Sequence, residues 1–220
     1  MKDPIGERER VLAAFLDAEK ESLASCCHAL ARAFARGGTL IAYGTGAAAT
    51  DASHVAVEFM HPVIVGKRAL PALAPPNDVH GLLRPGDIAF GIAHGPDPAV
   101  EAFLSLAGER GALTVSFGTA PADFTFVVPS DDPYVVQEVQ ETTYHVLWEL
   151  VHVFFEHPGL LDDACITCGD VAVEAQIVAV DGVTATIERD GQREHVATDL
   201  VDVAVGDTVL CHAGVVLEKL

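Results

Sequence analysis

The hydrophobic positions divide the sequence into two regions with different periods. Apolar residues recur every three or four positions over residues 5–36, including Val11, Phe15, Leu30 and Phe34, which predicts one long amphipathic helix. The pair Gly37-Gly38 follows it as a helix-ending signal. Residues 39–43 are then a short apolar run, which predicts a buried strand.

Strand and helix patterns alternate through the rest of the first region. We predict a helix that ends at Pro62, strands at 88–92, 112–117 and 124–128, and helices at 99–110 and 133–155. Residues 71–87 are rich in proline and are predicted to form a loop. Alternating units of this kind predict an α/β fold, a Rossmann-like three-layer arrangement with a parallel sheet between helices.

The pattern becomes purely β-like after about residue 160. Short apolar runs at 171–180 and 183–188, a further run from 195 and another at 209–212 are separated by turn signals such as Asp181-Gly182 and Asp190-Gly191. These features predict a small closed β-barrel of OB-like size. We therefore expect two domains, 1–158 and 165–220, joined by a linker.

Composition limits the possible partners and the compartment. The 220 residues carry a formal net charge of −19, which disfavours nucleic acid and anionic membrane surfaces as partners. The charged segment 1–10 does not resemble a signal peptide, and no apolar stretch reaches the length of a membrane span. Five cysteines without an export signal indicate reduced thiols, so we predict a cytoplasmic protein.

The second region carries a specific phrase at its end. Val-Gly-Asp-Thr-Val-Leu-Cys-His-Ala-Gly-Val-Val-Leu-Glu-Lys-Leu occupies 205–220, and Cys-Ile-Thr-Cys occupies 165–168. This segment resembles the HypC/HupF family of chaperones that assemble the iron centre of [NiFe] hydrogenases. The resemblance implies that Cys165 holds a transient iron–cyanide–carbonyl unit, with His212 as a second ligand and Cys168 assisting. It also implies a HypD-like maturation protein and the hydrogenase large subunit as partners. In the family this cysteine follows the initiator Met, whereas Cys165 is internal.

The cysteines alone permit other interpretations. A lone Cys-x-x-Cys is often a redox pair or half of a zinc site, and no second such motif occurs. Cys211, beside His212 on a predicted strand, is more typical of a buried small hydrophobic residue.

In the first region, His54 and Glu58 are four residues apart and share one face of a helix. Spacing alone is more typical of a helix-surface pair than of a site. However, residues 5–156 resemble the SIS (sugar isomerase) domain, specifically the GmhA branch of phosphoheptose isomerases. The resemblance implies a metal-binding quartet of His54, Glu58, Gln137 and His145. It further implies that Glu58 and His145 act as base and acid in aldose–ketose isomerisation, and that the chain forms a homodimer or homotetramer. Two imidazoles, a carboxylate and an amide oxygen suit zinc, and iron as well.

The predicted ligand loops depart from this family. Gly44-Thr-Gly-Ala-Ala48, followed by Asp51, replaces the family's Gly-Asn-Gly-Gly-Ser. Ala93-His94-Gly-Pro-Asp-Pro replaces a serine-rich second loop. A bare Gly-x-Gly such as Gly44-Thr45-Gly46 is also consistent with a simple tight turn. Each lost hydroxyl removes a charge-assisted hydrogen bond worth about 1.5–3 kcal/mol, and three such losses would weaken phosphate binding by several orders of magnitude.

Three hypotheses follow. The first is a [NiFe]-hydrogenase maturation factor, a HypC-like chaperone fused to a metal-binding SIS domain of altered specificity. The alternative is a metal-dependent isomerase of a sugar phosphate such as sedoheptulose 7-phosphate. The third is a catalytically inactive SIS interaction module, similar to DiaA-like adaptors.

Overall fold

The computed structural model describes residues 3–76, 81–156, 161, 172–189, 191–198, 200–212 and 214–220. Its internal contacts divide the chain into two compact units, Met1–Val153 and Phe154–Leu220, each of which is described by itself. Among the described residues, no helix combines the length and the apolar character needed to cross a lipid bilayer.

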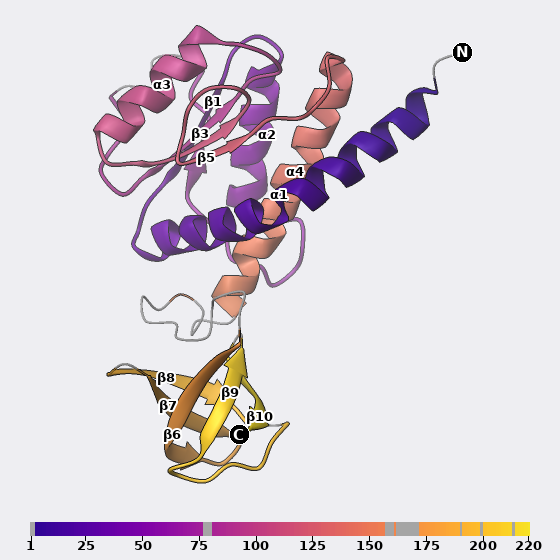
Figure 1. Cartoon of the computed structure of the whole chain (residues 1–220). Helices are drawn as coiled ribbons and strands as arrows, with labels where there is room; N and C mark the ends of the chain where they lie inside the picture. Colours follow the sequence, from indigo (N-terminus) through magenta and orange to yellow (C-terminus); the bar gives the residue numbers. More distant parts are fainter. Residues whose placement is uncertain are drawn as a thin grey trace. The chain divides into compact units, whose positions relative to one another are not determined.

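The first unit is built on a parallel five-stranded sheet in the order β2-β1-β3-β4-β5 (Figure 1). The strands are β1 (Leu40–Gly44), β2 (Ala72–Leu73), β3 (Ile88–Ile92), β4 (Leu113–Phe117) and β5 (Phe124–Phe126). Every pairing is parallel, which confirms the predicted α/β fold. The prediction of an uninterrupted loop over 71–87 was wrong, since β2 pairs with β1. A strand of two residues is too short to produce an alternating pattern in the sequence.

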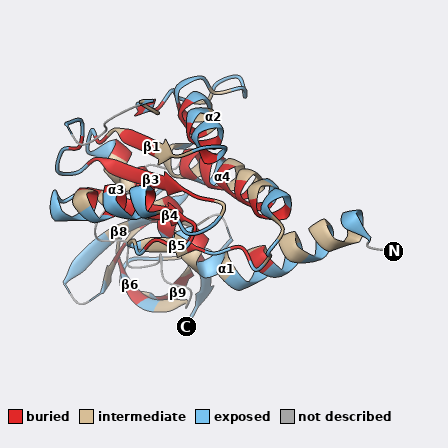
Figure 2. Ribbon diagram, turned by 90° about the horizontal axis from the view of Figure 1, so that it is seen from above, coloured by how far each residue is buried: buried red, intermediate tan, exposed pale blue. Residues whose placement is uncertain are grey.

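Four helices accompany this sheet: α1 (Pro4–Ala35), α2 (Ala48–Met60), α3 (Pro98–Glu109) and α4 (Pro133–Glu156). Three of them begin with proline in the first turn and an aspartate side chain before it. Asp3 accepts from the Gly6 N–H, Asp97 from those of Ala99 and Val100, and Asp132 from that of Tyr134. The first buried residue of α1 is Phe15, and Figures 1 and 2 show the preceding part of the helix extending beyond the sheet.

The core of the first unit lies at the sheet. All five residues of β3 are buried, as a strand covered on both faces must be. Three rings from adjacent strands pack in series, with ring centroids 5.0 Å apart for Phe90 and Phe117 and 5.3 Å apart for Phe117 and Phe126. Helices on both faces therefore hold the strand ends, and the loops that leave them, in fixed positions (Figure 2).

The second unit is a closed barrel in the order β10-β8-β7-β6-β9. Its strands are β6 (Val173–Asp181), β7 (Thr184–Arg189), β8 (Gln192–Ala197), β9 (Thr208–His212) and β10 (Val215–Lys219). Antiparallel pairs form most of the barrel, and β10 closes it by pairing with β9 and, in parallel, with β8. Its core contains Ile177, Ile187, Val196 and Val216 among others. The predicted closed β-barrel is confirmed, although its third strand begins at Gln192 rather than near 195.

Candidate functional site

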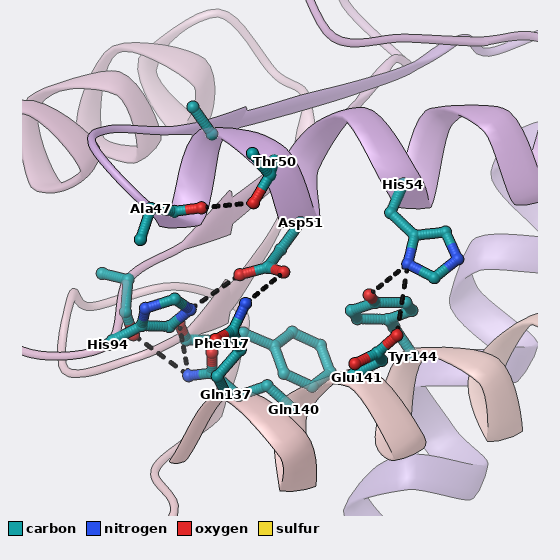
Figure 3. A network of polar contacts seen from close by, with 12 residues as sticks. Ala47, Thr50, Asp51, His54, His94, Phe117, Gln137, Gln140, Glu141 and Tyr144 are labelled. Carbon is teal, nitrogen blue, oxygen red and sulfur yellow. Dashed lines mark hydrogen bonds and ion pairs between the residues drawn. The ribbon is translucent and has the colours of Figure 1, made fainter. Parts of the chain in front are cut away.

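Polar side chains gather between α2 and α4, next to the loop after β3 (Figure 3). Because α2 begins directly after β1, the turn between them must be tight. A Cβ on Gly44 would lie 2.5 Å from the carbonyl oxygen of Ala48, and Gly46 has a φ of +56°. The backbone of the turn therefore requires both glycines, whether or not a ligand binds there.

Three side chains form a cluster with the chemistry of a metal site. One ligand atom each from His54, Glu58 and His145 lies within 4.8 Å of the other two. His54 Nε2 and Glu58 Oε1 lie 3.3 Å apart. Ligands at zinc-bond length in a tetrahedron are about 3.3–3.6 Å apart, so small side-chain movements would suffice to bind an ion. The donor set of two imidazoles and a carboxylate thus fits a divalent metal.

His54 also has partners on its other ring nitrogen. The hydroxyl of Tyr144 lies 2.9 Å from Nδ1 and Glu141 Oε1 lies 3.4 Å from it. Burial first, then the neighbouring carboxylates of Glu141, Asp51 and Glu58, raise the pKa of Tyr144, so its hydroxyl keeps its proton. Nε2 is available to a metal only when Nδ1 carries the ring proton. The oxygens of Tyr144 and Glu141 are placed to accept a hydrogen bond from that Nδ1–H group.

A second group of contacts lies one turn earlier on α2. Asp51, almost fully buried, accepts from the side-chain amide of Gln137 at 3.0 Å, and its other oxygen lies 2.7 Å from His94 Nε2 (Figure 3). Gln137 is therefore bonded to Asp51 through its amide nitrogen. Its role as a fourth metal ligand stays a prediction.

The two altered loops are bonded to each other. The Thr45 hydroxyl donates to the Asp97 carboxylate, whose other oxygen accepts from the backbone N–H groups of Ala99 and Val100. Burial raises the pKa of Asp97, but the bonds from Thr45, Val100 and Ala99 together outweigh burial and lower the pKa below its usual value. Asp97 therefore stays charged at neutral pH, and the Thr45 hydroxyl already has a partner.

Sequence reasoning did not single out Gln140 or Tyr144. The buried Gln140 amide donates to the carbonyls of Ala93 and Phe117 and so fixes α4 against the ends of β3 and β4. Both residues lie on the side of α4 that also carries Gln137. The helical period pointed to that side, but it did not indicate which residues make contacts.

In the barrel, the described residues include only one of the three predicted iron-binding side chains. His212 ends β9, and its Nδ1 is buried without a hydrogen-bond partner among the described residues. The adjacent Cys211 is buried in the barrel core, where burial, together with Glu194, raises its thiol pKa to about 11. Cys165 and Cys168 lie outside the described residues.

Comparison with known proteins identifies the first unit. The phosphoheptose isomerase of Solidesulfovibrio magneticus is 31% identical over 180 residues, covering 69% of this chain and 88% of that protein. The chain belongs to the phosphoheptose isomerase family. The enzyme of Aquifex aeolicus is 30% identical and is covered over 91% of its length. The structure of phosphoheptose isomerase GmhA from Neisseria gonorrhoeae shares the fold, with a TM-score of 0.59 at 19% identity over 67% of this chain and 94% of that one.

The second unit has a separate relationship. Residues 171–220 match the model of the HupF/HypC family, so this phosphoheptose isomerase family member carries a HupF/HypC-type barrel. Both predicted resemblances are thereby confirmed. The match begins after Cys165 and Cys168 and includes His212.

Proposed function

We propose that the chain is a [NiFe]-hydrogenase maturation factor whose barrel carries the iron–cyanide–carbonyl unit. The match of residues 171–220 to the HupF/HypC family is the observation that carries this proposal. In this proposal Cys165 holds the iron, Cys168 assists and His212 supplies an imidazole. The buried, unpartnered Nδ1 of His212 supports it, because such a nitrogen is unfavourable unless a ligand or proton donor is supplied.

In the first unit we propose a resident divalent metal, zinc or iron, held by His54, Glu58 and His145 with Gln137 as a fourth ligand. Such a metal would polarise a bound carbonyl or hydroxyl group. Glu58 and His145 are the groups that can accept and return a proton at the same place, since carboxylates and imidazoles commonly act as general bases and acids. In this role they would serve a ligand other than a sugar phosphate.

The loops support this altered specificity. A phosphate would meet the charged Asp97, whose carboxylate already accepts a hydrogen bond from the Thr45 hydroxyl of the first loop. It would also approach Asp51, which is paired with His94. Repulsion from two carboxylates adds to the loss of donors, and both effects act against a dianion.

The partners of this maturation factor would be a HypD-like protein and the hydrogenase large subunit. No residue of α1 before Phe15 is fully buried within its own unit, and this supports assembly into a homodimer or homotetramer through this helix. Such an assembly would cover the apolar side that this part of the amphipathic helix leaves partly exposed.

Infrared spectroscopy tests the iron-carrying role. The full-length protein, purified without oxygen from cells expressing the other maturation factors, should show cyanide and carbonyl bands. These bands should disappear in Cys165→Ala and weaken or shift in His212→Ala. The exposed His195 on β8 provides a matched control, and His195→Ala should leave the bands unchanged. Wild-type protein without such bands, or bands that persist in Cys165→Ala, would contradict the proposal.

A second candidate function, sugar-phosphate isomerisation, is favoured by the His54–Glu58–His145 cluster and by family membership. A coupled assay with sedoheptulose 7-phosphate and zinc-loaded protein measures it. We expect no turnover above background. Turnover that disappears in Glu58→Gln would establish the isomerase and would leave the infrared result to decide the role of the barrel.

A further inference from the structure

A cavity lies in the first unit at the end of the sheet where β1, β3 and β4 begin. It has a volume of about 690 Å³ and is lined by residues at or just before the amino ends of β1, β3 and β4, such as Thr39, Asp87 and Leu113. The His54 cluster and the altered loops follow the carboxyl ends of these strands. A volume of this size is typical of sites for small molecules.

Positive charge is concentrated around this cavity. Arg32 and Arg36 line it from the end of α1, and Arg84 lines it from the turn before β3, with His28 one helical turn before Arg32. The whole chain has only 13 Lys and Arg residues against 32 Asp and Glu. Three arginines therefore line one cavity in an otherwise strongly acidic protein, although Arg32 and Arg36 also have interactions of their own.

The acidic side chain at the cavity is already engaged. Among the described residues that line it, Asp87 alone is acidic, and its two carboxylate oxygens accept from the backbone N–H groups of Thr39 and Arg84, both at 2.9 Å. These bonds tie the start of β1 to the turn before β3. Gly38 packs against the same turn so closely that a Cβ there would lie 2.3 Å from the Gly86 carbonyl oxygen. This wall of the cavity is therefore preformed.

A purely structural role explains only part of this arrangement. Basic residues at the end of a helix offset its dipole, which accounts for Arg32 and Arg36. Arg84 belongs to a different segment, 48 residues or more along the chain, and its guanidinium has no hydrogen bond or ion pair with the described residues. Dipole compensation does not account for a third arginine there.

We propose that this cavity binds a small anionic molecule through a phosphate or carboxylate group. A planar guanidinium group can donate two parallel hydrogen bonds to the oxygens of either anion. Arg84 supplies a guanidinium group of this kind at the cavity, and Arg32 and Arg36, which already have interactions of their own, add positive charge from a separate segment. The remaining lining, which includes Ile41, Leu73 and Leu82, would contact an apolar portion of the ligand.

Isothermal titration of the full-length protein at low ionic strength tests this, with inorganic phosphate and succinate as separate probes. At least one probe should bind, and its Kd should rise about 10-fold or more in Arg84→Ala, because one charge-assisted contact is lost. Arg84→Lys, which keeps the charge but loses the planar fork, should bind with intermediate affinity. Phosphate binding alone would indicate a phosphorylated ligand, and succinate binding alone a carboxylate ligand.

Two controls separate this site from others. Arg10 is an exposed arginine on the same helix but away from the cavity, so Arg10→Ala should leave the Kd unchanged. His54→Ala, which disables the metal cluster, should also leave it unchanged. The inference is wrong if neither probe binds the wild-type protein, if Arg84→Ala binds as the wild type does, or if Arg10→Ala or His54→Ala weakens binding equally.

Discussion

Zinc affinity of the first unit should depend on Tyr144, although Tyr144 is not itself a predicted ligand. Tyr144→Phe removes the hydroxyl 2.9 Å from His54 Nδ1 and keeps the ring, which packs edge-on against both His54 and His145. The lost hydrogen bond is neutral and partly buried, worth about 0.5–1.5 kcal/mol, so the zinc Kd should rise roughly 2- to 12-fold. Competition with a chromophoric chelator measures this Kd directly, without requiring any catalytic activity.

The geometry also predicts an order of effects. Glu141 lies farther from Nδ1, at 3.4 Å, and its side chain is 42% exposed, so water screens its contribution. Glu141→Gln should therefore weaken zinc binding less than Tyr144→Phe does. Tyr134, 70% exposed on the same helix, provides the control, and Tyr134→Phe should have no effect. A Kd in Tyr144→Phe equal to that of the wild type, or a larger effect of Glu141→Gln, would refute this account of how His54 is oriented.

Three further predictions concern other parts of the chain. Asp97→Ala should lower the free energy of unfolding of the first unit by about 0.5–2 kcal/mol in urea titrations, because it removes the cap of α3. At pH 8 no more than two of the five thiols should react rapidly with a disulfide reagent. Burial raises the pKa of the Cys26 thiol, raises that of Cys27 to about 12 and contributes to raising that of Cys211 to about 11, so these three thiols stay protonated. Rapid reaction of three thiols would contradict this. Asp207→Asn should destabilise the barrel at neutral pH, and the variant barrel should lose less stability on acidification than the wild type does. The reason is that hydrogen bonds from Lys219 and Ala204 lower the pKa of Asp207, and they stabilise the fold only above the pH at which this carboxylate protonates. Thermal unfolding between pH 3 and 7 measures that difference.

The last of these follows from a specific pair of contacts. The Lys219 ammonium lies 2.7 Å from Asp207 Oδ2, and this oxygen also accepts from the Ala204 backbone. A carboxylate with a depressed pKa contributes stability above its unfolded pKa and loses it as the pH falls through the folded pKa. If the stability of Asp207→Asn depended on pH as that of the wild type does, the contact between Asp207, just before β9, and Lys219 of β10 would not stabilise the barrel.

Local signals in the sequence were sufficient for the fold class and for the elements other than β2. Neighbouring residues alone determine α1, through the three-to-four-residue period over 5–36, and the barrel hairpins, through their glycine turns. These elements appeared as predicted. β2 was missed because its two residues pair with a strand about thirty positions earlier, and nothing local requires that pairing.

Contacts across long sequence separations were the part that local patterns could not provide. The bond between Thr45 and Asp97 joins loops 52 residues apart, and the Tyr144–His54 contact spans 90. The arginine-lined cavity likewise combines the end of α1 with the turn at Arg84. Such contacts depend on the order of strands in the sheet and on the rotation of each helix about its axis. A periodicity in the sequence shows which side of a helix is buried, but not which residues of other elements that side contacts.

The pairing of β10 with both β8 and β9 affects the timing of folding during synthesis. The barrel cannot close before β10 has left the ribosome, whereas every element of the first unit's sheet has been made by then. At ordinary elongation rates the residues of the second unit take roughly 3–13 s to synthesise. The first unit therefore has several seconds in which to fold before the barrel can form.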